Sequence, residues 1–185
     1  MSKISIKTKI IIGLLILTSV FYVSCEMESY TPKRDTVIAD FSENSGKFMN
    51  AATESLALGK DVFISHSDYY ETKKEVIGFY VSDIREENVE AYNGKNFIEL
   101  YNLGIINSVS TKVTSLLSAV EFNCGGGSNY YCGVYYVTED KPLFLPDFSV
   151  ELSVDGEGFS VVSNNIEWYT QKLSDNFYYF KAQIN

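Results

Sequence analysis

Alternating hydrophobic and polar residues run through most of the chain beyond residue 60 and predict a protein built mainly of β-strands. The clearest case is FSVELSVDGEGFSVV, in which hydrophobic residues recur at every second position. Side chains of a strand point alternately to its two faces, so we expect one face of this strand to pack on a core and the other to meet water. The residues expected on the core face are Phe148, Val150, Leu152 and Val154.

Turn sequences separate the predicted strands and pair them into hairpins. Residues 61–70 and 74–84 flank a short polar segment, and residues 174–176 join the last two strands. Asn93-Gly94 is typical of a type I′ turn, in which both central residues need positive φ, so we expect a further hairpin there. The sequence DGEG turns the chain after the alternating strand described above.

One segment before these strands has the periodicity of a helix. In DFSENSGKFMNAATESLALGK, hydrophobic residues fall on one face at spacings of three and four. Asp40 and Glu43 are placed as a capping box at its start, and Gly59 is placed to end it. The residues predicted on its buried face are Phe41, Phe48, Met49, Ala52 and Leu56.

Together these elements predict a mainly β fold of the α+β class. About eight strands and one N-terminal helix favour an antiparallel β-sandwich or a curled sheet packed on that helix. A chain of 185 residues has room for one domain of ordinary size. About two thirds of the surface of the unfolded chain can be buried at this size, so the domain can fold without additional stabilising cross-links.

The N-terminus has a different pattern, which predicts an export signal. Three lysines and no acid precede an apolar run over residues 10–23, and the run ends at Ser24 and Cys25. A helix that spans a bilayer needs about 20 apolar residues, so this run is short for a retained anchor. The alternative is a plain secretory signal that leaves Cys25 as an odd thiol.

The residues around Cys25 resemble the cleavage site of bacterial lipoproteins, in which a small residue precedes a cysteine that is acylated and becomes the mature N-terminus. Ser24 is the small residue here, and Tyr22 stands where that family usually has leucine. The resemblance implies removal of residues 1–24, lipidation of Cys25 and attachment to a bacterial membrane. The acidic EMES that follows is similar to surface-export signals of some lipoproteins and favours the outer membrane or cell surface.

The next segment, EMESYTPKRDT, is polar and contains a proline, so we expect a flexible tether over residues 25–36 and a single β-rich domain over 37–185. The whole chain has a formal charge of −9, and removal of the N-terminal lysines makes it more acidic. Nucleic acids and anionic lipid headgroups would repel such a surface, so no nucleic-acid partner is expected. A cationic partner would suit it better, although acidity can serve solubility alone.

Two cysteines remain once Cys25 is assigned to the lipid. Cys124 and Cys132 enclose the glycine-rich loop of CGGGSNYYC between two predicted strands. Exported proteins meet an oxidising compartment, so we expect a disulfide that closes this hairpin. A metal pair is the alternative, but His66 is the only histidine and a tetrahedral site needs four ligands, so no metal is expected.

The unusual feature of the composition is aromatic, with 14 Tyr, 12 Phe and one Trp. Tyrosine combines contact area with a hydrogen-bonding tip, which suits a binding surface for a protein or a glycan. An aromatic β-core is the alternative. The residues that we consider for binding are Tyr130, Tyr131, Tyr135, Tyr136, Trp168 and Tyr179, and we expect the restrained loop at Tyr130 and Tyr131 to be part of that surface.

Catalytic motifs are sparse, so we expect a binding protein rather than an enzyme, and no cofactor. His66 lies between two serines, but adjacent strand residues point to opposite faces and cannot form a triad. Asp155 and Glu157 in VDGEG are read as solvated turn acids. Two alternatives stay open: an envelope hydrolase with paired carboxylates, and an inhibitor or immunity-type lipoprotein that covers a basic enzyme.

Overall fold

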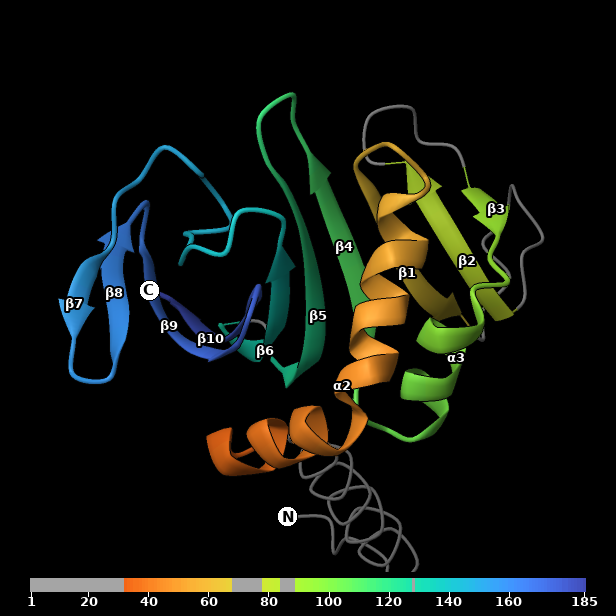
Figure 1. The fold of residues 1–185 in the computed structure, drawn as a ribbon, viewed down its shortest axis with the longest axis horizontal. Helices are drawn as coiled ribbons and strands as arrows, with labels where there is room; N and C mark the ends of the chain where they lie inside the picture. Colours follow the sequence, from red (N-terminus) through yellow and green to blue (C-terminus); the bar gives the residue numbers. More distant parts are fainter. Residues whose placement is uncertain (1–31, 68–77, 84–88, 128) are drawn as a thin grey trace, which may run out of the picture. The chain divides into compact units, whose positions relative to one another are not determined.

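The computed structural model describes residues 32–67, 78–83, 89–127 and 129–185. Its strands form one antiparallel sheet with the order β3-β2-β1-β4-β5-β6-β10-β9-β8-β7 (Figure 1). The strands are β1 (Val62–Ser67), β2 (Gly78–Asp83), β3 (Val89–Ala91), β4 (Ser108–Val113), β5 (Ser118–Gly126), β6 (Tyr130–Val137), β7 (Ser153–Asp155), β8 (Gly158–Ser163), β9 (Ile166–Ser174) and β10 (Phe177–Ile184).

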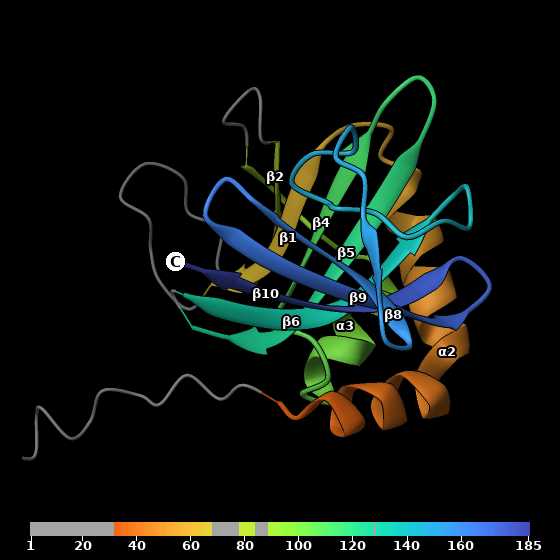
Figure 2. The same ribbon diagram turned by 90° about the vertical axis from the view of Figure 1, so that its left-hand side faces the viewer.

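The predicted mainly β fold is confirmed in its coarse form. The described residues form ten strands rather than about eight, and these strands make one continuous sheet rather than the two sheets of a sandwich. Two helices, α2 (Arg34–Leu56) and α3 (Lys95–Asn102), accompany the sheet. Figure 2 shows both helices on the same side of the β4, β5 and β6 strands.

Helix α2 begins earlier than the sequence pattern predicts. It starts at Arg34, so Asp40 and Glu43 lie inside it and the predicted capping box is wrong. The helix is interrupted at Asn44, whose φ of −122° is not helical. The side-chain amide of Asn44 donates a hydrogen bond to the carbonyl oxygen of Asp40, 3.0 Å away. This bond satisfies a carbonyl that the interruption would otherwise leave free.

The buried face of α2 follows the prediction at most positions. Phe41, Phe48 and Ala52 are buried, and Leu56 is half-buried against the same core. Met49 is 39% exposed, so its predicted place on that face is wrong. A helix has about 3.6 residues per turn, so Met49, which directly follows the fully buried Phe48, lies toward the edge of the buried face.

The hairpin predicted at Asn93-Gly94 is wrong, because the chain forms helix α3 there. Gly94 has φ −64°, which is outside the type I′ region, and it is the residue that precedes the helix. Phe97 and Leu100 are fully buried at a spacing of three, a pattern that a helix satisfies and an alternating strand does not. Glu54 of α2 accepts hydrogen bonds from the backbone and side-chain amides of Asn96, at 3.2 and 2.6 Å.

The sheet has a hydrophobic core on each face. The first lies between the sheet and the two helices, and the second lies between β5, β6, β9 and β10 and the segment after β6. Fully buried aromatic rings of the first core include Phe48, Phe97 and Phe122. Large buried side chains of the second core are Tyr135, Phe144, Trp168, Tyr178 and Phe180.

Predictions for the C-terminal strands are confirmed in part. The β9–β10 hairpin turns at residues 174–176, and DGEG turns between β7 and β8, with Gly156 at φ 58°. The prediction that the alternating run before DGEG forms one long strand is wrong, because only Ser153–Asp155 of that run is a strand. Val154 lies in this edge strand and is 78% exposed, so it has no place in the core.

Strands β1 and β2 form the hairpin expected in the first part of the sheet. The turn that joins them falls at residues 68–77, outside the described residues. Residues 1–31, which include the predicted signal and Cys25, also lie outside them. None of the helices that the structure describes is long and apolar enough to cross a membrane.

The predicted disulfide is wrong, because Cys124 and Cys132 are free thiols in the structure. The β5–β6 register shifts next to Cys124, and Cys132 pairs with Gly125 instead. Both thiols are buried in the first core, where their sulfur atoms lie 3.7 Å from the carbonyl oxygens of Phe122 and Pro32 respectively. Backbone pairing and packing therefore hold this hairpin without a covalent bridge.

Candidate functional site

The aromatic residues predicted to bind a partner are divided between the surface and the core. Tyr135, Trp168 and Tyr179 have side chains that are buried, so the expectation that they lie on the surface is wrong. Neighbouring residues of a strand point to opposite faces, and both faces of the sheet are packed at these positions. The alternative of an aromatic β-core is the correct description of these three residues.

Tyr131 and Tyr136 are half-buried at the edges of the two cores. The ring of Tyr131 packs edge-on against Phe180, with 5.7 Å between centroids. The ring of Tyr136 lies 5.2 Å from that of Phe177 on the opposite face. Neither ring lines a cavity among the described pockets, so their packing accounts for them.

Tyr130 has a different position, because it lines two adjoining cavities on the helix side of the sheet. The cavities have volumes of about 260 and 640 Å³ and share Tyr130, Asp155, Tyr169 and Lys181. Both are open to solvent, and the larger has the size of a small-ligand site. We call this surface the tyrosine groove, and its central residues are Tyr130, Asp155, Glu157, Glu167, Tyr169, Lys181 and Gln183.

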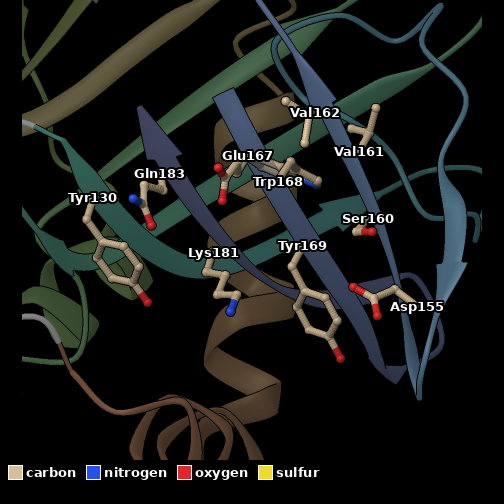
Figure 3. Close-up of a pocket in the computed structure, with 10 residues that line it drawn as sticks. All are labelled: Tyr130, Asp155, Ser160, Val161, Val162, Glu167, Trp168, Tyr169, Lys181 and Gln183. Atoms are coloured by element: carbon tan, nitrogen blue, oxygen red, sulfur yellow. The ribbon is translucent and has the colours of Figure 1, made fainter. Parts of the chain in front are cut away.

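The register of three strands assembles the groove from distant parts of the sequence. Gln183 of β10 pairs with Tyr130 of β6 on one side and with Glu167 of β9 on the other. Lys181, two residues earlier in β10, pairs with Tyr169 of β9. Residues two apart in a strand share a face. Figure 3 shows these five side chains on the same side of the sheet, with Asp155 beside Tyr169.

A polar network fixes one wall of the groove. Arg34, the first residue of α2, donates hydrogen bonds from Nε and a terminal nitrogen to the side-chain oxygen of Gln171, the first at 3.1 Å. Gln171 donates in turn to a carboxylate oxygen of Glu157, 3.4 Å away, and Arg34 lies 3.9 Å from the same oxygen. The start of α2, β9 and the β7–β8 turn are therefore tied together.

Gly158 explains how the ring of Tyr169 lies across the sheet. A methyl group on Gly158 would come within 2.7 Å of the ring carbon and hydroxyl of Tyr169, and it would overlap the carbonyl oxygen of Thr170. The ring thus rests on bare backbone. The ammonium of Lys181 lies 5.5 Å from the centre of this ring, a cation–π distance. Tyr169 is held from two sides while staying half-exposed.

The phenols of Tyr130 and Tyr179 lie close enough to influence each other's pKa. Burial raises the pKa of Tyr130, the proximity of Cys132 raises it further, and the interaction with Tyr179 opposes the shift. Burial also raises the pKa of Tyr179. Both phenols are therefore protonated at neutral pH and act as hydrogen-bonding groups rather than charges.

Among the described residues, charges of both signs line the groove in equal number. The acids are Asp155, Glu157 and Glu167, and the bases are Lys33, Arg34 and Lys181. The carboxylate of Glu167 accepts a hydrogen bond from the side-chain amide of Asn185 at 2.8 Å. The groove is thus close to neutral, although the whole chain carries a charge of −9.

A separate cavity of about 310 Å³ lies on the other face of the sheet and is lined by Glu121 of β5. Burial raises the pKa of Glu121 to about 7. Lys112 lines the same cavity, but its ammonium donates to the carbonyl oxygens of Leu145 and Pro146, at 3.2 and 3.1 Å. It also lies 4.4 Å from the centre of the Phe148 ring. Lys112 thereby fastens the segment after β6 to the sheet.

Groups suited to catalysis or metal binding give no assembled site in the described part of the chain. His66 lies in β1 as a strand residue, and its ring stacks on Tyr101 with 5.4 Å between centroids. No three residues among the described His, Cys, Asp and Glu are grouped to hold a metal. Asp155 and Glu167 line one cavity but are both exposed. The paired-carboxylate hydrolase stays a prediction.

Most residues of the tyrosine groove were not predicted from the sequence. Tyr169, Lys181 and Gln183 lie in predicted strands with the correct pairing, yet no local feature marks their face as the uncovered one. The spacing of Tyr169 and Lys181 about the turn at 174–176 could have identified them as cross-strand neighbours. Comparison with known proteins adds nothing to this picture, because no family model, curated protein or solved structure matches the chain.

Proposed function

We propose that this protein is a non-enzymatic, lipid-anchored component of the bacterial cell envelope that binds a protein or a glycan through the tyrosine groove. The observation that carries the proposal is the groove itself: an uncovered, concave part of the sheet with half-exposed tyrosines above a rigid base. Rigid aromatic side chains lose little entropy on binding, which makes them effective contact residues.

The placement in the envelope is supported by the sequence alone. The lysine-rich start, the short apolar run and Ser24-Cys25 resemble a lipoprotein signal. A single acyl chain gives marginal membrane binding, so the two or three chains of a processed lipoprotein are needed for a stable anchor. With a short tether, the groove would then sample the envelope close to the membrane surface.

The groove is part of the fold's rigid structure rather than a loop that must order on binding. Its two tyrosines, with Glu167, Lys181 and Gln183, come from β6, β9 and β10, which are joined by antiparallel pairing. The network of Arg34, Gln171 and Glu157 fastens the adjacent turn. Preorganisation of this kind reduces the free energy lost on association.

A sedimentation experiment tests the proposal. Envelope fragments from the producing cells are stripped of lipid with detergent, and the purified full chain is incubated with them and pelleted. Wild-type protein should pellet with the fragments, and Tyr169→Ala and Gln183→Ala should each raise the half-saturating concentration about tenfold or more. Tyr80→Ala, which removes a half-buried tyrosine from β2 in another part of the sheet, is the matched control and should behave as wild type.

Two measurements keep the result interpretable. The melting temperature of each variant shows whether the domain is folded, and Gln183→Ala is the critical variant because its side chain is exposed and contributes little to the core. Equal pelleting of wild type, Gln183→Ala and Tyr169→Ala would contradict the proposal. Absence of pelleting by the wild type would contradict it as well.

A further inference from the structure

We propose that the ligand of the tyrosine groove is a neutral oligosaccharide, an inference that rests on the function proposed above. The C–H faces of a sugar ring are apolar and pack on aromatic rings, while its hydroxyl groups point outward and require donors and acceptors. A matching site therefore needs exposed aromatic rings flanked by planar polar side chains. The groove presents this combination.

The aromatic part is supplied by Tyr130 and Tyr169. Both are half-exposed, come from different strands and line both cavities of the groove. Each has its ring held in place, Tyr130 by packing against the first core and Tyr169 by its contacts with Gly158 and Lys181. Two fixed rings on one face favour an extended ligand with more than one apolar face, which a chain of sugar units provides.

The polar part lies between and beside these rings. Gln183 is flanked by Tyr130 and Glu167 in the strand register, so an amide and a carboxylate are side by side. An amide offers two donors and an acceptor, and a carboxylate accepts at two oxygens. Neighbouring hydroxyls of a sugar can donate to one group and accept from the other. Lys181 and Asp155 provide the same pair of functions near Tyr169.

Charge balance favours a neutral ligand over an ionic one. Three acids and three bases of the described residues line the groove, so this surface neither attracts a polyanion nor concentrates a polycation. A protein partner would normally find a more apolar centre to its contact surface. The described lining of the smaller cavity includes only two aliphatic residues, Val161 and Val162, and its other side chains are polar or aromatic.

The sedimentation assay distinguishes the ligand class when the fragments are treated before use. Periodate cleaves carbon–carbon bonds between adjacent hydroxyl-bearing carbons and is reduced to iodate, so it destroys most sugar rings. Protease digestion removes protein from the fragments. We expect periodate to reduce groove-dependent pelleting at least tenfold and protease to leave it unchanged. Raising NaCl from 0.05 to 0.5 M should change half-saturation by less than about threefold, because a neutral ligand is not screened.

Each outcome bears on one of the two proposals. Groove-dependent pelleting that protease abolishes and periodate spares would overturn the oligosaccharide inference and leave the groove as a binding site for protein. Periodate-sensitive pelleting that weakens tenfold in high salt would overturn the neutral character of the ligand. Pelleting that is the same for wild type, Tyr169→Ala and Gln183→Ala would remove the proposed function together with the inference.

Discussion

Replacing Glu121 by glutamine should make the protein more stable above neutral pH. The carboxyl group lies in the cavity beneath the segment after β6, and burial raises its pKa to about 7 from an ordinary value of 4.5. Tyr131 lies close enough for the charge of Glu121 to raise its own pKa, so the two groups share this face of the sheet. Glutamine has nearly the same shape and carries no charge to be desolvated.

The sign and size follow from proton linkage. Between pH 4.5 and about 7 the folded protein keeps the proton on Glu121 while the unfolded chain loses it, so wild-type stability falls as pH rises through this window. A shift of one pKa unit corresponds to about 1.4 kcal/mol, which gives an upper value of roughly 3 kcal/mol. Glu121 is only half-buried by surface area, so we expect about 2 kcal/mol.

Urea unfolding of wild type and Glu121→Gln at pH 4, 6 and 8 measures the effect. The two proteins should have similar free energies of unfolding at pH 4, and the variant should exceed wild type by about 2 kcal/mol at pH 8. Glu151→Gln, at an exposed position before β7, is the control and should stay within about 0.5 kcal/mol of wild type throughout. A difference for Glu121→Gln that does not grow with pH would show that the Glu121 carboxyl does not have a raised pKa in the folded protein.

Three further predictions concern the anchor, the thiols and the packing of the sheet. Cys25→Ser should release the protein from the membrane fraction and abolish labelling by fatty-acid analogues, and unchanged retention would refute lipidation. Cys124 and Cys132 should react with a thiol reagent only after unfolding, because both are buried and burial raises the pKa of Cys132 to about 11. If neither cysteine reacted even after the protein was unfolded, the two would not be free thiols and the prediction would be wrong. Gly133→Ala should lower the free energy of unfolding by about 3 kcal/mol or more, because the added methyl would overlap a carbonyl oxygen of β5. Gly46→Ala is the control, since its methyl would enter open space and should raise the free energy of unfolding slightly. Chemical denaturation measures both changes.

The parts of the fold that the sequence predicted depend on local information. The turns at DGEG and at residues 174–176 use residues that tolerate positive φ, and Gly156 and Asn176 adopt it. The strands beside them have the composition that strands favour. Such features involve only neighbouring residues, so they can be recognised before the tertiary structure is known.

The parts that were missed depend on packing between distant segments. Helix α3 was predicted as a strand, because Asn93-Gly94 is a strong local turn signal; burial of Phe97 and Leu100 against α2 and the sheet overrides it. The aromatic residues of β6 and β10 could not be assigned to surface or core, because that depends on which face the segment after β6 covers. The groove could not be predicted for the same reason, because its residues are identified only by the absence of a helix or loop over them in the tertiary structure.

Tyrosine spectra of the groove give the most direct test of the central claim. The full chain can be produced with fluorinated tyrosine, and the ¹⁹F signals of Tyr130, Tyr169 and Tyr80 can be assigned by single substitutions to phenylalanine. Oligosaccharides released from the envelope fragments are then titrated into the protein. We expect the signals of Tyr130 and Tyr169 to shift with one common saturation curve while that of Tyr80 stays in place. Saturable shifts at other tyrosines, with Tyr130 and Tyr169 unchanged, would contradict this expectation.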